Sequence, residues 1–414
     1  MEPDGPFSRR ESARLVSVLT RVFGVENLSL AEDVAQETLA SAFEAWSYGG
    51  VPAHYSALLT ASAKNRAIDV LRRERTARKF APELTRFIES EWTLRPVVDD
   101  MFQPGALEDD ELRMMFSCCH PRLHEEAQVP LILNILCGFH VDEIAAAFLA
   151  SAAAIHKRLA RGKKVLAGSI RLFDLKAQDF VERLSAVQRA LYLLFNEGYH
   201  GASAEAVVRG DLCRQAMRLG GMLVAHAPSS IPSTKALASL MCLNAARLPA
   251  RTDAAGDLKG LFEQDRSRWD PQLIAEGVEL LADSAAGDEL SAYHVEARIA
   301  ALHATAPDAG ETPWGEIVDL YDVLMRIAPS PVVALNRAVA LAQHQGAAPG
   351  LAALRSIRDK ERLAGYPFYP AALGELELRL GHAVAALRHF EEAHRLARNV
   401  AERRFIEQRI AACD

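Results

Sequence analysis

The apolar residues of this 414-residue chain recur with a helical period almost throughout, and no strand-rich block interrupts them. Ala and Leu are abundant, whereas alternating runs rich in Val, Ile and Thr are scarce, and this mixture favours helices. A chain of this length is too long for one compact core, so we expect two or more domains. The sequence therefore predicts an all-α protein with several domains.

Breaks along the chain divide it into three parts. Two small helical modules are separated by an acidic stretch, VVDDMFQPGALEDDE, in which a Pro-Gly pair interrupts the helical pattern. After the second module the chain reads as helix after helix for more than 200 residues. We therefore predict helical modules at residues 1–80 and 109–172, a linker at 81–108, and a helical C-terminal domain at 173–414.

The sequence shows no signal for a membrane or for export. No apolar run approaches the ~20 residues needed to span a bilayer. The N-terminus, MEPDGPFSRRES, lacks the apolar core of a signal peptide. The six cysteines are scattered in apolar helical contexts, as buried thiols are in a reducing cytosol. We therefore expect a cytoplasmic protein with no membrane partner.

The stretch KNRAIDVLRRERTARK, residues 64–79, holds seven Lys or Arg, whereas the whole chain carries a net charge of −7. On a helical wheel its polar face lies opposite an apolar side formed by Ala67, Ile68, Val70 and Leu71. Cations and donors on one side of a rigid element suit a nucleic-acid backbone. The alternative is a solvated amphipathic helix with internal ion pairs. The polar face contains Asn65, Arg66, Asp69, Arg72 and Arg73.

A neighbouring segment, AEDVAQETLASAFEAW, is predicted to be a helix with an acidic face. One side carries Val34, Leu39, Phe43 and Trp46, and the other side is polar. An acidic face repels DNA and should instead meet a basic protein surface. The polar residues on this side are Asp33, Gln36, Glu37 and Glu44.

The second module contains FHVDEIAAAFLASAAAIHKRLARGKKVL, which fits a helix-turn-helix. We expect a first helix at 141–148, a turn at Leu149-Ala150 and an N-cap at Ser151. The second helix is basic outside its apolar stripe, although Ala152–Ala154 offer no hydrogen bonds to base edges. The alternative is a helical hairpin with a basic surface. The apolar stripe is Ile155, Leu159, Gly162 and Leu166, and the basic residues include His156, Lys157, Arg158, Arg161, Lys163 and Lys164.

These two modules together resemble a bacterial sigma factor of the extracytoplasmic-function (ECF) type. The acidic helix is similar to the region 2 helix that docks on RNA polymerase, and SALLTASAKNRAIDVLRRERT is similar to the helix that reads the minus-ten element. The segment from DELRMM to GKKVL resembles region 4, which reads the minus-thirty-five element. FSCCHP, LYLLFNEGY and DRSRWD resemble a subgroup with a helical, tetratricopeptide-like extension.

The resemblance implies roles for these residues and partners for the chain. Core RNA polymerase and promoter DNA are the implied partners, with the C-terminal domain or an unidentified regulator controlling activity; no cofactor is implied. Asp33, Gln36, Glu37 and Glu44 would face polymerase. The first DNA face would be Asn65, Arg66, Asp69, Arg72 and Arg73, and the second His156, Lys157, Arg158, Arg161 and Lys164.

One repeat of the C-terminal domain can be argued from its residues. Leu373-Gly374, Ala386, Phe390 and Ala393 match the spacing of the tetratricopeptide pattern, and PVVALNRAVALAQHQG is a looser copy. For the first part of this domain, up to about residue 308, an irregular helical bundle is the simpler interpretation.

Catalysis and metal binding have weaker support in the sequence. YLLFNEGYH and EQDRSRWDP contain acids, Arg and His, but no nucleophile motif or phosphate loop accompanies them, so Glu197, Asp265, Arg266, Arg268 and Asp270 are interpreted as an ion network. CCHPRLH could suggest a metal site, but adjacent cysteines chelate poorly. We therefore expect no enzyme activity and no metal.

Two other classes of function stay open. One is a free-standing helix-turn-helix regulator with a helical sensor domain, which never joins polymerase. The other is a helical sensor enzyme with a DNA-binding appendage.

Overall fold

A computed structural model of the chain describes residues 6–74, 91–148, 150–168, 175–200, 208–253 and 257–413. Within these ranges the regular elements are helices, and the one extended pairing is an isolated bridge between Thr252 and Leu258. The predicted all-α class is therefore confirmed. The chain divides into two compact units, Met1–Leu194 and Phe195–Asp414. No helix in the described ranges has both the length and the apolar character needed to cross a membrane.

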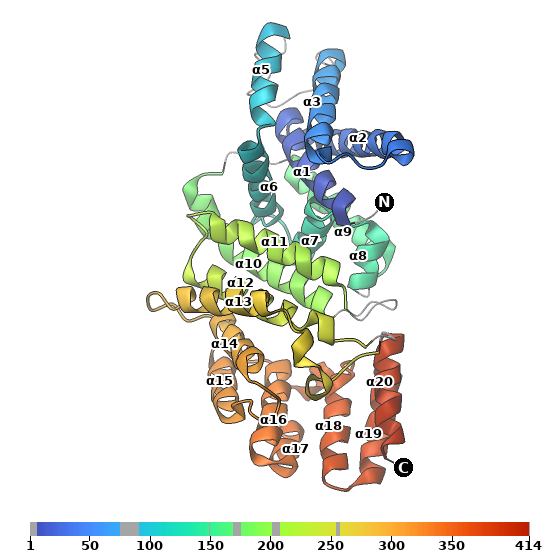
Figure 1. Cartoon of the computed structure of the whole chain (residues 1–414), viewed down its shortest axis with the longest axis vertical. Helices are drawn as coiled ribbons and strands as arrows, with labels where there is room; N and C mark the ends of the chain where they lie inside the picture. Colours follow the sequence, from blue (N-terminus) through green and yellow to red (C-terminus); the bar gives the residue numbers. More distant parts are fainter. Residues whose placement is uncertain are drawn as a thin grey trace. The chain divides into compact units, whose positions relative to one another are not determined.

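The helices of the first unit run in chain order from α1 to the start of α10 (Figure 1). They are α1 (Pro6–Phe23), η1 (Val25–Asn27), α2 (Leu28–Gly49), α3 (Tyr55–Glu74), α5 (Glu91–Met101), α6 (Pro104–Cys118), α7 (Glu125–Leu131), the π-helical η2 (Ile132–Leu136), α8 (Val141–Ala147), α9 (Ala152–Ala167) and α10 (Ala177–His200).

The second unit contains the end of α10 and the helices that follow it (Figure 1). They are α11 (Gly210–Ala225), α12 (Pro232–Ala245), η3 (Leu248–Ala250), η4 (Leu261–Glu263), η5 (Arg266–Arg268), α13 (Pro271–Ser284), α14 (Ala292–Thr305), α15 (Trp314–Ile327), α16 (Pro331–Gln345), α17 (Ala347–Arg355), η6 (Lys360–Leu363), α18 (Phe368–Arg379), α19 (Ala383–Leu396) and α20 (Val400–Ala411).

The predicted domain boundaries are only partly within reach of the structure. Residues 75–90, which contain the end of the first predicted module and the start of the linker, lie outside the described residues, as does the boundary at 172/173. Apart from Phe102 and Gln103, the described part of the predicted linker is helical. Its acidic pair Asp99-Asp100 belongs to α5, and its Pro-Gly pair begins α6. Proline is favourable in the first turn of a helix because the backbone N–H groups there have no carbonyl partner within the helix, so the missing N–H of proline costs nothing.

Helix α1 supplies the centre of the first unit. Its residues Leu15, Val18, Leu19, Val22 and Phe23 are completely buried. The helix packs against α2, α3 and α6, so that both ends of the predicted two-module region share one core. The packing stabilises this unit because buried apolar area contributes roughly 25 cal/mol per Å².

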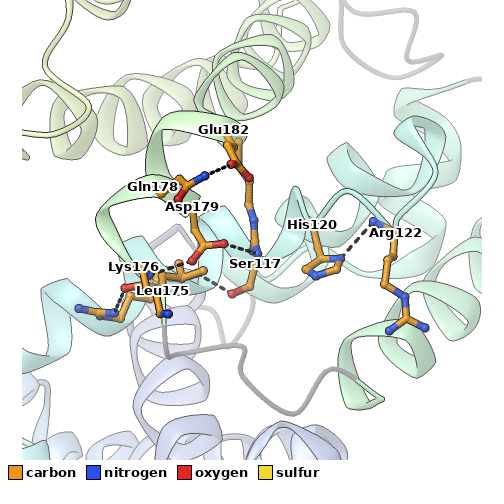
Figure 2. A network of polar contacts seen from close by, with 10 residues as sticks. Ser117, His120, Arg122, Leu175, Lys176, Gln178, Asp179 and Glu182 are labelled. Atoms are coloured by element: carbon orange, nitrogen blue, oxygen red, sulfur yellow. Dashed lines mark hydrogen bonds and ion pairs between the residues drawn. The ribbon is translucent and has the colours of Figure 1, made fainter.

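The start of α10 is joined to α6 by a polar network, drawn in Figure 2. Asp179 accepts a hydrogen bond from the backbone N–H of Lys176 at 2.9 Å and pairs with Arg183 at 3.3 Å. Arg113 of α6 donates to the carbonyl of Leu175. Beside the network, the rings of Phe116 and Phe180 pack edge to face, with their centroids 4.8 Å apart. The first turns of α10 are therefore part of the first unit.

Close helix crossings organise the second unit around α12, whose residues are nearly all buried. A Cβ added at Gly277 of α13 would lie 2.6 Å from Leu243 of α12, and Ser239 donates to the carbonyl of Gly277. Small residues are required at such a crossing because the backbones approach closely. The predicted irregular bundle lies here.

Antiparallel helix pairs follow, and adjacent pairs share apolar clusters. α16 and α17 share one cluster with α18, and α18, α19 and α20 share the next (Figure 1). The residues of the predicted repeat lie on α18 and α19. Gly374 faces Phe390, where an added Cβ would lie 2.8 Å from the ring, and Ala386 and Ala393 are fully buried.

Candidate nucleic-acid interface

Helix α3 presents the predicted basic face to solvent. Its apolar side places Ala67, Ile68 and Leu71 in the core, as the helical period predicts. Asn65, Asp69, Arg72 and Arg73 are exposed, and Arg66 is half-buried. All five predicted residues therefore share the polar side of α3, whose apolar side is buried in the core of the first unit.

Two ion pairs organise this face. Arg72 pairs with Asp69 at 3.6 Å, one helical turn away. Arg66 leaves the face and reaches α2, where its Nη1 lies 3.1 Å from Oε2 of Glu37 and its Nη2 donates to Ser41. Both pairs are solvent-exposed and contribute about 0–1 kcal/mol each. They orient the arginines, and a phosphate group can replace the carboxylates at little cost.

Helix α2 carries the predicted acidic face. Asp33, Gln36, Glu37 and Glu44 are all exposed, and Val34 and Leu39 on the opposite side are buried. The rings of Phe43 and Trp46 pack edge to face at 6.1 Å near the end of the helix. The Arg66–Glu37 pair shows that the predicted polymerase and DNA faces adjoin.

Helices α8 and α9 form the predicted pair of the second module. The hydroxyl of Ser151 accepts a hydrogen bond from the N–H of Ala154, so this residue caps α9 as expected. Residue 149 of the predicted turn lies outside the described residues. The predicted stripe is buried: Ile155, Leu159, Gly162 and Leu166.

The basic residues of α9 fall into two groups. His156, Lys157, Arg161 and Lys164 are exposed and available to a polyanion. Arg158 is half-buried and pairs with Glu126 of α7 at 3.1 Å. The exposed group contains no acid, which is the electrostatic form of a DNA-binding helix.

Two ion pairs between distant segments were not predicted. Lys163 of α9 lies 2.6 Å from Glu32 of α2, and Arg21 of α1 lies 3.0 Å from Asp110 of α6. Burial raises the pKa of Asp110 to about 7, although Arg21 opposes this. A helical wheel assigns a residue to a face but not to a partner 89 or 131 residues away, so no signal in the sequence points to these pairs.

The possible metal motif is divided between core and surface. Cys118 and Cys119 are buried, and burial raises the pKa of the Cys119 thiol to about 12. The ring of His124 is engaged as the N-cap of α7, where it accepts from the N–H of Glu126. Across the described ranges no group of three or more His, Cys, Asp or Glu is arranged to hold a metal ion.

Two acids of the predicted ion network of the C-terminal domain have backbone partners. Asp265 caps η5 and Asp270 caps α13, each by accepting backbone N–H groups. Arg266 donates to the backbone carbonyls of His303 and Ala306, at 2.8 and 2.5 Å. The sequence places these charges close together, but helix capping and helix C-termini offer better partners than a neighbouring side chain.

Comparison with known proteins connects these faces to a family. Residues 7–77 match the family model for sigma-70 region 2, which covers α1, α2 and α3. An uncharacterized protein of Rhizobium meliloti (strain 1021) is 36% identical over 398 residues, which cover 95% of this chain and 92% of that protein. The chain belongs to that protein's family.

The sigma-70 region 2 indicates a sigma-factor-like role in transcription initiation, with core RNA polymerase and promoter DNA as partners. The acidic face of α2 and the basic face of α3 both lie inside this region. Residues 183–285 match a family of unknown function, DUF6596. Helices α8 and α9 lie in neither range, so their role stays a prediction.

Proposed function

We propose that this chain is an ECF-type sigma factor whose C-terminal helical domain regulates its activity. The observation that carries the proposal is the sigma-70 region 2 match over a unit that exposes one acidic and one basic helix face. The chain itself would perform no catalysis, because polymerase supplies the chemistry of RNA synthesis.

The acidic face of α2 and the basic face of α3 are proposed to bind different partners. Asp33, Gln36, Glu37 and Glu44 on α2 would dock on a basic surface of polymerase. On α3, the amide of Asn65 can hydrogen-bond an unstacked minus-ten base, and the arginines can hold the adjoining phosphates. Asp69 orients Arg72 and does not itself contact phosphate.

Helix α9 is proposed to dock on the duplex at the minus-thirty-five element. Its exposed Lys157, Arg161 and Lys164 would contact phosphates. Because Ala152–Ala154 begin the helix, its N-terminal turn can touch thymine methyl groups but cannot hydrogen-bond base edges. DNA shape would therefore contribute much of its selectivity.

Reconstitution with core polymerase tests the proposal. The wild-type chain should bind core and direct initiation from a cognate promoter. The double variant Asp33→Ala, Glu37→Ala should lose core binding, whereas Asp288→Ala, Glu289→Ala, which removes the same charge from an exposed turn of the second unit, should not. A chain that neither binds core nor directs initiation contradicts the proposal.

A free-standing DNA-binding regulator is the second candidate, favoured by the exposed basic residues of α9. It predicts tight duplex binding by the chain alone, which Arg161→Gln weakens and the Asp33, Glu37 double variant leaves unchanged. The sigma proposal predicts that promoter-specific binding requires core polymerase.

The regulatory role of the C-terminal domain is proposed from its size and its stacked, tetratricopeptide-like helix pairs, which commonly present a peptide-binding face. It would act by packing on the sigma modules or by contacting polymerase. Removal of residues 201–414 tests this while keeping α10. Unchanged promoter activity and an unchanged response to signal would exclude it.

A further inference from the structure

A group of arginines and aromatic rings in the second unit has no role in the proposed function. The guanidinium of Arg251 stacks over the ring of Tyr199, with its Cζ 4.1 Å from the ring centroid. Arg247 and Arg266 lie against the ring of Trp269, at 5.3 and 4.7 Å. Tyr199 and Trp269 are each 4% exposed, whereas Arg247, Arg251 and Arg266 are half-buried. We call Arg247, Arg251 and Arg266 with these two rings the arginine cluster.

No carboxylate forms an ion pair with the cluster in the part of the chain that the structure describes. Arg247, Arg251 and Arg266 form none of the ion pairs found there, although nearby Lys259 and Arg404 pair with Asp253 and Asp257. Such a concentration of cations at half-buried positions is unfavourable unless a counter-charge is present.

Three acids on the segments around Arg266 are used for other contacts. Asp265 and Asp270 cap helices. Asp308, whose charge Arg266 does sense, accepts hydrogen bonds from the backbone N–H groups of Gly310 and Glu311. None of these three carboxylates therefore pairs with an arginine of the cluster.

Two buried donors inside the cluster lack acceptors, although Arg266 donates to the backbone carbonyls of His303 and Ala306. Nε of Arg251 and Nε1 of Trp269 are buried and have no hydrogen-bond partner. Arg247 has only two long contacts, both at 3.4 Å, to the side-chain oxygen of Gln264. Buried N–H groups without an acceptor are rare in proteins and call for one.

Titratable groups around the cluster respond to its positive potential. Burial alone would raise the pKa of Tyr199, yet Arg247 and Arg251 lower it below its ordinary value. Burial, Arg247 and Arg266 together lower the pKa of His303 to about 4, so this ring is neutral at physiological pH. Burial and Arg247 lower the pKa of Arg266 as well.

We propose that the arginine cluster binds the phosphate group of a small molecule. The guanidinium forks of Arg247 and Arg251 match phosphate oxygens in two-pronged geometry, and stacking on Trp269 and Tyr199 holds these forks in fixed planes. Arg266, whose donors are held by backbone carbonyls, adds positive charge. Three cations without an acid favour a doubly charged phosphate over a single carboxylate. This assignment does not depend on the sigma proposal, and it gives the second unit a ligand through which activity could respond to metabolism.

Calorimetric titration of the full chain with inorganic phosphate, at constant ionic strength and about pH 8, tests the site. We expect saturable binding with one site per chain. The double variant Arg247→Gln, Arg251→Gln should weaken this binding at least tenfold. Arg358→Gln, at an exposed position elsewhere in the second unit, should bind as the wild type does.

Several outcomes would overturn the proposal. Absence of saturable phosphate binding, unchanged binding in the double variant, or loss of binding in Arg358→Gln would each contradict it. Equal binding of acetate under the same conditions would contradict the choice of phosphate. If circular dichroism shows that the double variant is unfolded, Arg251→Lys keeps the charge and loses the fork; it should weaken binding about tenfold, and unchanged binding counts against the site.

Discussion

At the scale of single residues, the surroundings of a charge decide what it contributes. Arg66 and Glu37 form an exposed pair that adds little stability, so both remain available for partners. Asp110 has no exposed side-chain surface, and burial destabilises its charged form more than the nearby Arg21 stabilises it, so that its pKa is raised. Exposed ion pairs of this unit therefore add little stability, whereas the buried acid makes stability depend on pH.

Asp110→Asn should make the stability of the first unit less dependent on pH. The folded chain keeps a proton on Asp110 up to about pH 7, whereas the unfolded chain releases it near 3.8. Between these values the folded state binds more protons, so the free energy of unfolding falls as pH rises. Relative to the variant, the wild type should lose about 2–3 kcal/mol between about pH 5 and about pH 8. Urea denaturation measures this difference.

The exposed acid Asp142 provides the control, since Asp142→Asn should change the pH dependence very little. A wild-type-to-variant difference that stays constant with pH would show that Asp110 ionises normally in the folded chain.

Arg161→Gln should weaken DNA binding and reduce its dependence on salt. Each phosphate contact releases counter-ions and contributes about −0.9 to the slope of log K against log salt. Loss of one contact should therefore lower the slope by about 1 and weaken binding similarly on all sequences. Fluorescence anisotropy with promoter DNA, and core polymerase present, measures both quantities. Arg358→Gln is the control, and an unchanged slope would place Arg161 away from phosphate.

At the scale of helices, close approaches between neighbours depend on a few small residues. Gly162 allows α9 to approach Leu131 of α7, and Gly374 allows α18 to approach Phe390 of α19. The helical period predicts which side of each helix is buried but not how closely two helices pack. A glycine inside a helix lowers the stability of the helix by about 1 kcal/mol relative to alanine, so a glycine at a close crossing indicates a steric requirement.

Gly374→Ala should destabilise the second unit. The added Cβ would lie 2.8 Å from two carbons of the Phe390 ring, which is 1% exposed and cannot move freely. Overpacking of this kind costs about 1–3 kcal/mol, more than the gain in helix propensity. Gly221→Ala, in a helix with no atom within 4 Å of the new Cβ, should instead stabilise by up to ~1 kcal/mol. Thermal unfolding compares the two; stabilisation by both would contradict the crossing.

At the scale of the whole chain, the division between the units falls inside one helix. α10 runs from Ala177 to His200, and the compact units divide between Leu194 and Phe195. Its first turns bury Phe180, Leu184 and Val187 in the first unit. A helix shared in this way makes the sequence-based boundary near residue 172 a poor place to end a fragment.

A chain ending at His200 should therefore be more stable than one ending at Leu172. The shorter fragment loses the Phe116–Phe180 contact and the caps around Asp179, and burial of each large apolar side chain contributes about 1.5–3 kcal/mol. Thermal unfolding followed by circular dichroism should give a clearly lower midpoint for the shorter fragment. Equal midpoints would mean that the start of α10 adds nothing to the first unit.

The sequence by itself determined the helical class, the buried stripes of α3 and α9, the cap at Ser151 and the exposed polar faces of α2, α3 and α9. These follow from local rules: a period of 3.6 residues and a side chain that caps the N–H groups of its own helix. The sequence also carried the resemblance that the region 2 match supports.

Only the tertiary structure decided which faces meet. The Glu32–Lys163 and Arg21–Asp110 pairs and the arginine cluster join segments far apart in the chain, and the closeness of the Gly374–Phe390 crossing depends on how two neighbouring helices pack. Periodicity gives each helix an orientation toward the core, but it contains no information about the neighbour on the other side. That neighbour is chosen by the packing of whole helices, because burial energy is shared among many side chains and depends on the shape of both surfaces.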